Sequence, residues 1–298
     1  MPILTLRQLL DSGIHYGHRV SRWNPKMRPF IYGKRNLIHI LDVRETVRGL
    51  VAAYKFVAKV VAQGKDVLFV GTKRQAQMAI RQAAEKCRMP YVCERWLGGT
   101  LTNYQVIRRR LARLEELEQL EAQGALEQMT KKEAARIRRE IAQIRSNMEG
   151  LRQMTRLPGA LFVVDPRHER NAVLEANRLG IPTICLLDTD CDPDYCDICI
   201  PGNDDAMRAI EIVVNKIADA VLEGRAQRVE PVQPLEPPKD AVESEAATSS
   251  RVGRTRSRRQ VAPTRMESAP SAQMDTDVAA TAPPQESPAN NSKEGEQR

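Results

Sequence analysis

Four aspartates at alternate positions form the pattern in this sequence that most resembles a reactive or metal-binding site. They are Asp188, Asp190, Asp192 and Asp194, directly after the apolar residues 183–187. Carboxylates at the end of a buried strand suit a hard cation, because ligands of open α/β sheets bind at that edge. The run lacks the glycine and the later glutamate of a calcium loop, and Pro193 interrupts it. We therefore favour a turn with helix-capping carboxylates and retain a Mg²⁺-dependent enzyme site as the alternative.

Other residues with reactive or ligating side chains do not form a complete set. Cys191, Cys196 and Cys199 lack an evident fourth zinc ligand. His15 and His18 are three residues apart, which allows a metal pair, but packed or RNA-facing histidines fit better. No order of Ser, His, Asp or Cys indicates a catalytic set. We expect no catalytic residue, no cofactor and no bound metal.

Nucleotide-binding glycine motifs are also missing from the sequence. Neither G-x-x-x-x-G-K-[ST] nor G-x-G-x-x-G after a strand occurs. The segment VGTKR, residues 70–74, predicts a tight turn before a helix, and such a helix start can hold one phosphate. Because turns of this kind are common, the segment alone does not indicate a nucleotide site.

A strongly basic segment is the most informative feature of the chain. Residues 19–35, RVSRWNPKMRPFIYGKR, contain six cations and three aromatic rings but no acidic residue. Pro25 and Pro29 exclude a continuous α-helix. We predict an extended basic arm, residues 15–36, that offers cations to phosphates and flat rings to bases. A basic surface loop with buried aromatics is the alternative.

The candidate RNA-binding residues lie in this arm and at three later positions. In the arm they are Arg19, Arg22, Trp23, Asn24, Lys26, Arg28, Tyr32, Lys34 and Arg35. The others are Lys73 and Arg74 at a helix start, Arg95 before a glycine turn, and Arg108, Arg109 and Arg110. The cations would neutralise phosphates, Trp23 or Tyr32 would stack on a base, and Asn24 would donate or accept a hydrogen bond.

Charge is distributed unevenly along the 298 residues. The formal net charge is +8, but residues 1–228 hold 37 of the 46 basic and 27 of the 38 acidic residues, a net of +10. The part expected to fold is thus the basic part, which suits a polyanionic partner. No run of 18 apolar residues predicts a membrane span, and we expect no export signal. The six cysteines are then expected to be thiols in bacterial cytoplasm.

Apolar runs alternate with helical periodicity over most of the chain. Near-continuous apolar strands are predicted at residues 66–70, 91–93, 160–165, 183–187 and 197–200, with residues 37–41 as an edge strand or a strand-like entry. Runs without polar alternation are typical of a parallel sheet covered on both faces. The pattern predicts an α/β domain over residues 1–104 and 155–228. Asp42 and Glu45 predict a capping box before a helix.

Two further segments do not belong to this pattern. In residues 105–154, apolar residues recur at spacings of three and four on both sides of Gly124, which predicts an antiparallel α-helical hairpin of coiled-coil type. Thr130 and Glu133 predict a second capping box. Residues 229–298 hold no aromatic residue and are rich in Pro, Ser, Ala, Glu and Thr, so we predict a disordered tail.

Five long motifs resemble one known family. GIHYGHRVSRWNPKMRPFIYGKRNLIHILDV, VLFVGTKRQAQ, ERWLGGTLTNYQVI, ALFVVDPRHERNAVLEANRLGIPTICLLDTDCDPD and IPGNDDAMRAI resemble the bacterial ribosomal protein S-two family, the second protein of the small subunit. The likeness covers residues 4–222. Cys93 stands where the family usually has Asn, and Asp190 where Asn is common. The tail lies outside the likeness.

The resemblance implies both a fold and a role. It implies a flavodoxin-like three-layer sandwich with a five-stranded parallel sheet and an inserted coiled-coil hairpin. It implies a non-catalytic constituent of the small ribosomal subunit that binds small-subunit rRNA, supports assembly and helps to dock ribosomal protein S-one. A metal- or nucleotide-dependent α/β enzyme and a pure protein-docking adaptor are the competing hypotheses.

Overall fold

A computed structural model describes residues 5–127 and 129–228 of the chain. The predicted disordered tail, residues 229–298, lies outside the described residues. No helix within the described part of the chain has the length and apolar character needed to cross a membrane. The first element is the short helix α1 (Leu6–Asp11), whose N-cap Thr5 forms a capping box with Gln8.

Five apolar runs form one parallel sheet, as the sequence predicted. The strands are β4 (Val67–Val70), β5 (Tyr91–Val92), β6 (Ala160–Val164), β7 (Thr183–Leu187) and β8 (Ile198–Pro201). They are arranged β5-β4-β6-β7-β8, and every neighbouring pair is parallel. In chain order this is 2-1-3-4-5, the order of flavodoxin-like sheets. Strands β4, β6 and β7 are buried at every position, which explains their lack of polar alternation.

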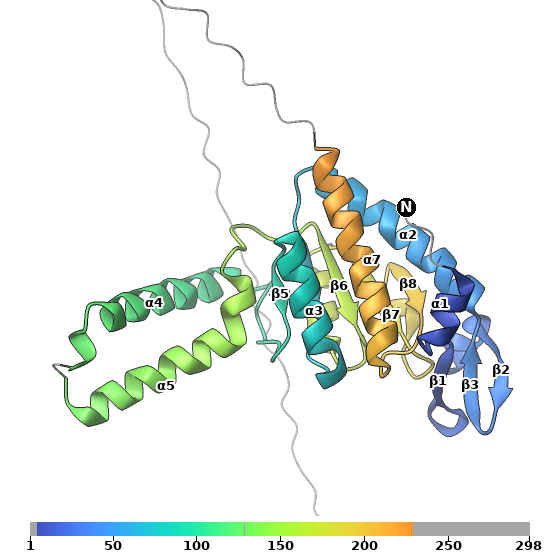
Figure 1. The fold of residues 1–298 in the computed structure, drawn as a ribbon, viewed down its shortest axis with the longest axis horizontal. Helices are drawn as coiled ribbons and strands as arrows, with labels where there is room; N and C mark the ends of the chain where they lie inside the picture. The colour runs from blue at the N-terminus through green and yellow to red at the C-terminus, as the bar shows by residue number, and fades with distance from the viewer. Residues whose placement is uncertain (1–4, 128, 229–298) are drawn as a thin grey trace, which may run out of the picture. The chain divides into compact units, whose positions relative to one another are not determined.

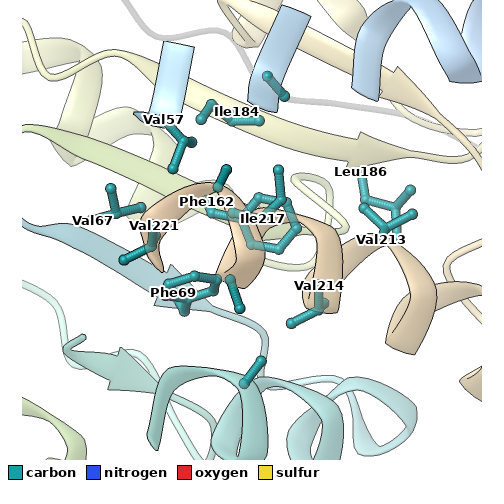
Figure 2. Close-up of a cluster of buried hydrophobic side chains, with 14 of the residues drawn as sticks. Val57, Val67, Phe69, Phe162, Ile184, Leu186, Val213, Val214, Ile217 and Val221 are labelled. Carbon is teal, nitrogen blue, oxygen red and sulfur yellow. The ribbon is translucent and has the colours of Figure 1, made fainter. Parts of the chain in front are cut away.

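Three helices cover one face of this sheet (Figure 1). They are α2 (Val43–Ala62), α3 (Arg74–Cys87) and α7 (Met207–Ala226). Figure 2 shows the centre of this layer, where Phe69 and Phe162 of the sheet lie against Ile217 and Val221 of α7. The two phenyl rings are 5.6 Å apart between centroids. Asp42 caps α2 by accepting from the Arg44 N–H, as N-cap aspartates do. The capping box predicted with Glu45 is not formed, because the Glu45 carboxylate pairs with Arg48 instead.

The opposite face of the sheet packs against α6 (Arg170–Arg178). Alternate residues of each strand point to the two faces: Phe162 belongs to the first layer, and Leu161 and Val163 belong to the second. Ala172, Val173 and Ala176 supply the contact surface of α6. The sheet is therefore the middle layer between two apolar clusters.

Ile217 offers a direct test of the first layer. It is fully buried, and truncation to alanine removes three carbon atoms from a packed interior. We expect Ile217→Ala to lower the free energy of unfolding by about 2–5 kcal/mol in denaturant titrations. Leu222 lies on the same helix with 36% of its surface exposed, so Leu222→Ala should cost about 1 kcal/mol or less. Equal losses for the two variants would contradict this packing.

A second sheet, with three antiparallel strands, precedes the parallel one. Its strands are β1 (Tyr16–Arg19), β2 (Ile31–Arg35) and β3 (Ile38–Leu41), with β3 in the centre. Residues 38–41 do form a strand, as predicted, but β3 lies in the centre of this second sheet, so the expected edge position is wrong. A short apolar run predicts a strand but does not indicate which sheet contains it. Asn36 and Leu37 both have positive φ, 50° and 60°, as the tight turn between β2 and β3 requires.

Two long helices follow β5 in the chain. They are α4 (Tyr104–Ala122) and α5 (Lys131–Met148), which lie side by side (Figure 1). Leu114, Leu117 and Ile141 form a small apolar cluster between them. Thr130 and Glu133 form the predicted capping box at the start of α5. Nearer the sheet, Ile107 and Met148 join the cluster on its second face.

Candidate nucleic-acid interface

The basic arm, residues 15–36, is attached to the carboxyl edge of the parallel sheet. Thr189, which follows β7, accepts from the Asn24 N–H at its backbone oxygen (2.8 Å) and from the His18 N–H at its Oγ1 (2.9 Å). Gly17 passes so close to Thr189 that a Cβ there would lie 2.5 Å from its Cγ2. Met27 is fully buried in the second apolar cluster. These contacts attach the arm to the sheet domain both at β1 and in the segment between β1 and β2.

The arm is not extended throughout, so that prediction is wrong for its centre. Between β1 and β2 the backbone forms two 3₁₀ helices, η1 (Val20–Arg22) and η2 (Pro25–Phe30). Asn24 caps η2 by accepting from the Lys26 N–H at 3.0 Å. Pro25 occupies the first helical position, where a missing N–H costs little. The prolines exclude an α-helix, as expected, but they allow these tighter turns. The side-chain oxygen of Asn24, a residue predicted to hydrogen-bond RNA, is thus already used within the arm.

Five cations of the arm have no ionic partner within residues 5–127 and 129–228. They are Arg19, Arg22, Arg28, Lys34 and Arg35, and all are exposed. Unpaired exposed cations retain their full charge for an external anion. This group, called the arm cations below, is the part of the predicted site that the structure keeps available.

The two predicted stacking residues differ in exposure. Tyr32 on β2 is 80% exposed, so its ring face is open. Trp23 is half-buried and packs against His39, with ring centroids 5.1 Å apart. A new base would have to share or displace that contact. Tyr32 is therefore the better candidate for stacking.

Lys26 differs from its neighbours in the arm because its charge is already matched. Its Nζ lies 2.5 Å from Asp194 Oδ2 and 2.9 Å from Asp192 Oδ2. Hydrogen bonds to Asp194 and Asp192 raise the pKa of Lys26. Two of the four alternating aspartates thus pair with the arm, which no local pattern could reveal because 166 residues separate Lys26 from Asp192.

Lys73 is likewise paired with carboxylates, at the turn after β4. Its Nζ lies 2.6 Å from Asp205 Oδ1 and 2.9 Å from Asp204 Oδ1. Burial opposes the charge, but the hydrogen bonds to these two aspartates outweigh it and raise the pKa of Lys73. The neighbouring Thr72 N–H donates to Glu169 Oε1 at 2.8 Å. The turn predicted to hold a phosphate therefore binds carboxylates of the chain itself, while Arg74 is exposed.

Arg95 is exposed in the loop after β5, and a buried carboxylate fixes that loop. Glu175 on α6 is 7% exposed and accepts from Trp96 Nε1 (3.1 Å), the Gly99 N–H (2.8 Å) and the Leu101 N–H (3.0 Å). Burial alone would raise the pKa of Glu175, but hydrogen bonds from Gly99 and Trp96 outweigh it and lower the pKa. Gly99 has φ +90°, a conformation that favours glycine.

The remaining predicted cations lie on α4. Arg108, Arg109 and Arg110 are exposed in its first two turns. These three arginines and Arg95 follow β5, which is an edge strand of the parallel sheet. The arm instead contacts Thr189, in the loop that follows β7. The predicted site residues are thus distributed over several elements and do not form one compact cluster.

Sequence reasoning missed a group of ionisable residues at the carboxyl ends of the parallel strands. This strand-end cluster contains His18, Lys73, Asp165, Asp188, Asp190, Asp204 and Asp205. All of its members except His18 lie one to four residues after the end of β4, β6, β7 or β8, and such strand ends meet at one edge. That rule, applied to all strands together, could have found the cluster. Asp188 and Asp190 belong to it, whereas Asp192 and Asp194 do not.

Besides Lys73, two members of the cluster have strongly shifted pKa values. Close contact with Asp188 raises the pKa of His18 to about 9, although burial acts against this. Burial raises the pKa of Asp204 to about 8, and the charges of Asp165 and Asp188 add to the effect. Lys73 acts in the opposite direction on Asp204. The cluster is therefore crowded with negative charge.

The fold and the candidate site define an α/β protein with a flavodoxin-like sheet whose exposed feature is a cationic arm. The family model described as Ribosomal protein S2 matches residues 9–224. The chain belongs to this family, which is the one that the five motifs resembled. A protein of this family is structural and not an enzyme, so the expectation of no catalytic role is confirmed.

A curated relative supports the same assignment. The small ribosomal subunit protein uS2 of Rhodopirellula baltica is 53% identical over 222 residues. The matched region is 74% of this chain and 85% of the relative. The likeness thus extends over most of both proteins.

Proposed function

We propose that this chain is a constituent of the small ribosomal subunit and binds small-subunit rRNA through its basic arm. The observation that carries the proposal is the group of five arm cations, exposed and without carboxylate partners in the described part of the chain. Each is free to neutralise one phosphate, and phosphate contacts supply most of the affinity of such interfaces. The open ring of Tyr32 adds a stacking surface beside them.

The footprint extends beyond the arm in this proposal. Arg74, Arg95 and the three arginines of α4 are exposed and can reach further phosphates. Lys26 and Lys73 are assigned a smaller part, because RNA would first have to displace their aspartate partners. Trp23 and Asn24 are assigned to shaping the arm, with base contact as a secondary role.

We also infer that α4 and α5 form an antiparallel coiled-coil hairpin. The short link through η3 (Ala125–Glu127) and the cluster of Leu114, Leu117 and Ile141 support this inference. The family resemblance extends the proposal to subunit assembly, to docking of ribosomal protein S-one and to bacterial cytoplasm. The hairpin and the sheet domain would then contact neighbouring ribosomal proteins as well as rRNA.

Sedimentation of the tagged full-length chain through a sucrose gradient tests the proposal. The chain should co-sediment with small subunits and remain bound at physiological salt. High salt should release it, because the contacts are largely ionic. Recovery only at the top of the gradient at low salt would overturn the proposal.

A hairpin-deleted variant separates RNA binding from pure protein docking. If the arm binds rRNA, a chain in which a short linker replaces residues 105–154 should still bind purified small-subunit rRNA. A pure docking adaptor would show no RNA binding in either form. Binding lost only with the hairpin would place the RNA contact on α4 and contradict the role of the arm.

A further inference from the structure

Three ligand atoms of the strand-end cluster converge within the protein. His18, Asp188 and Asp204 each offer one atom, and these atoms lie within 4.8 Å of one another. Asp188 and Asp204 are 1% and 0% exposed, and His18 is half-buried. The three residues come from β1, the end of β7 and the loop after β8. Long-range folding is thus needed to bring them together.

The Asp204 side chain contains a buried oxygen without a hydrogen-bond partner among the described residues. Asp204 Oδ2 accepts nothing, although Oδ1 of the same carboxylate accepts from Lys73 at 2.9 Å. A buried polar atom without a partner costs about 1–3 kcal/mol, and more when it carries charge. Such a cost is unusual in a native interior, and a bound cation would remove it.

Neighbouring groups orient the side chains of Asp188 and His18. Asp188 Oδ1 accepts from the Thr189 N–H at 2.5 Å, which leaves its Oδ2 facing His18. On the far side of the imidazole, His18 Nε2 lies 3.4 Å from Asp205 Oδ2. His18 Nδ1 is 2.9 Å from Asp188 Oδ2 but lacks the direction of a hydrogen bond. In zinc sites, one nitrogen of a ligating histidine usually binds the ion and the other ring nitrogen donates to a carboxylate.

The charges at this edge also leave room for a cation. Five aspartates, at positions 165, 188, 190, 204 and 205, face Lys73, Arg167 and His18. When all five carboxylates are ionised, two negative charges remain unmatched even with His18 protonated. A neutral His18 bound to a divalent ion would restore the balance to within one charge.

We propose that His18 Nδ1, Asp188 Oδ2 and Asp204 Oδ2 bind one Zn²⁺ ion. The imidazole nitrogen favours zinc over Mg²⁺, which prefers oxygen ligands, and three protein ligands leave a fourth position for water. Asp165 and Cys191, which form a second group with Asp204, lie beside the ion and can replace the water. The ion is structural: it ties β1 of the basic arm to the strand ends. The proposal is independent of RNA binding.

Zinc binding by the purified full-length chain tests this site. After EDTA treatment and dialysis, titration with zinc chloride should give one tightly bound ion per chain and raise the melting temperature. Asp204→Asn keeps the size of the side chain, so it should fold and yet bind zinc at least about 100-fold more weakly. His18→Gln should have the same effect. Asp192→Asn, from the same aspartate run but outside the site, should bind as the unchanged chain does.

Comparison of the variants also identifies other sources of bound zinc. Cysteine-bound zinc would be the same in the unchanged chain and in Asp204→Asn, so only the difference between them reports on this site. Equal zinc affinity in these two proteins would overturn the proposal. Preference for Mg²⁺ over Zn²⁺ would overturn the assignment of His18 as a ligand.

Discussion

Neutralising three arm cations is expected to lower the affinity for rRNA by about 100-fold at 0.15 M salt. The triple variant Arg22→Gln, Arg28→Gln, Lys34→Gln removes three phosphate contacts without introducing repulsion. Each contact contributes a slope of about 0.9 to the dependence of log K on log salt, so the slope should fall in magnitude by about three. Filter binding to purified small-subunit rRNA over a range of salt concentrations measures both quantities.

Two matched controls separate this effect from a general loss of charge. Arg136→Gln, Arg138→Gln, Arg139→Gln makes the same charge change on exposed positions of α5. This variant should change the slope of log K against log salt by no more than about one unit relative to the unchanged chain. Lys26→Gln alters a lysine already paired with two aspartates and should have less effect than Arg28→Gln. If the α5 variant weakened binding as much as the arm variant, the arm would not be the interface.

Replacing Glu175 by alanine is expected to lower the free energy of unfolding by about 3–5 kcal/mol. The substitution leaves the Trp96 indole N–H and the Gly99 and Leu101 N–H groups without their acceptor in a buried position. Each such donor costs about 1–3 kcal/mol, and water entering the space recovers part of this. Chemical denaturation of the full-length chain gives the value. Glu211→Ala, at an exposed position of α7, is the control and should change stability by about 0.5 kcal/mol or less.

The pH dependence of the same site has a defined sign. The folded protein lowers the pKa of Glu175, so its ionised form stabilises the fold at any pH above the pKa of the unfolded chain. This contribution is lost as the pH falls through the lower, folded-state pKa. The stability difference between the unchanged chain and Glu175→Gln should therefore be constant near neutral pH and shrink in acid. A difference that grew in acid would contradict the lowered pKa.

The parallel sheet could be predicted because its information is local. The runs at β4, β6 and β7 are almost continuously apolar. Such a run is typical of a strand that is covered on both faces of the sheet. Residues 38–41 show a similar run, yet they pair with residues of the basic arm. Strand partners depend on the packing of the whole chain, so a four-residue run cannot reveal them.

The candidate site was harder to predict because its electrostatics are non-local. Sequence alone marked Lys26 and Lys73 as free cations, but carboxylates 166 and 131 residues away neutralise them. Arg22 and Arg28 have sequence neighbours similar to those of Lys26, yet they have no ionic partner among the residues that the structure describes. Lys26 is paired because its side of the arm faces the aspartates after β7. The spacing of residues along the sequence does not reveal which side of the arm does so.

The attachment of the arm through Thr189 has a consequence for the thermodynamics of association. The hydrogen bonds that the Asn24 and His18 N–H groups donate to Thr189, together with the burial of Met27, order the loop when the protein folds. A partner that uses this loop then meets a preorganised surface and loses little conformational entropy on contact. Calorimetry of such a complex should show a small heat-capacity change, unlike the large negative one that accompanies coupled folding and binding.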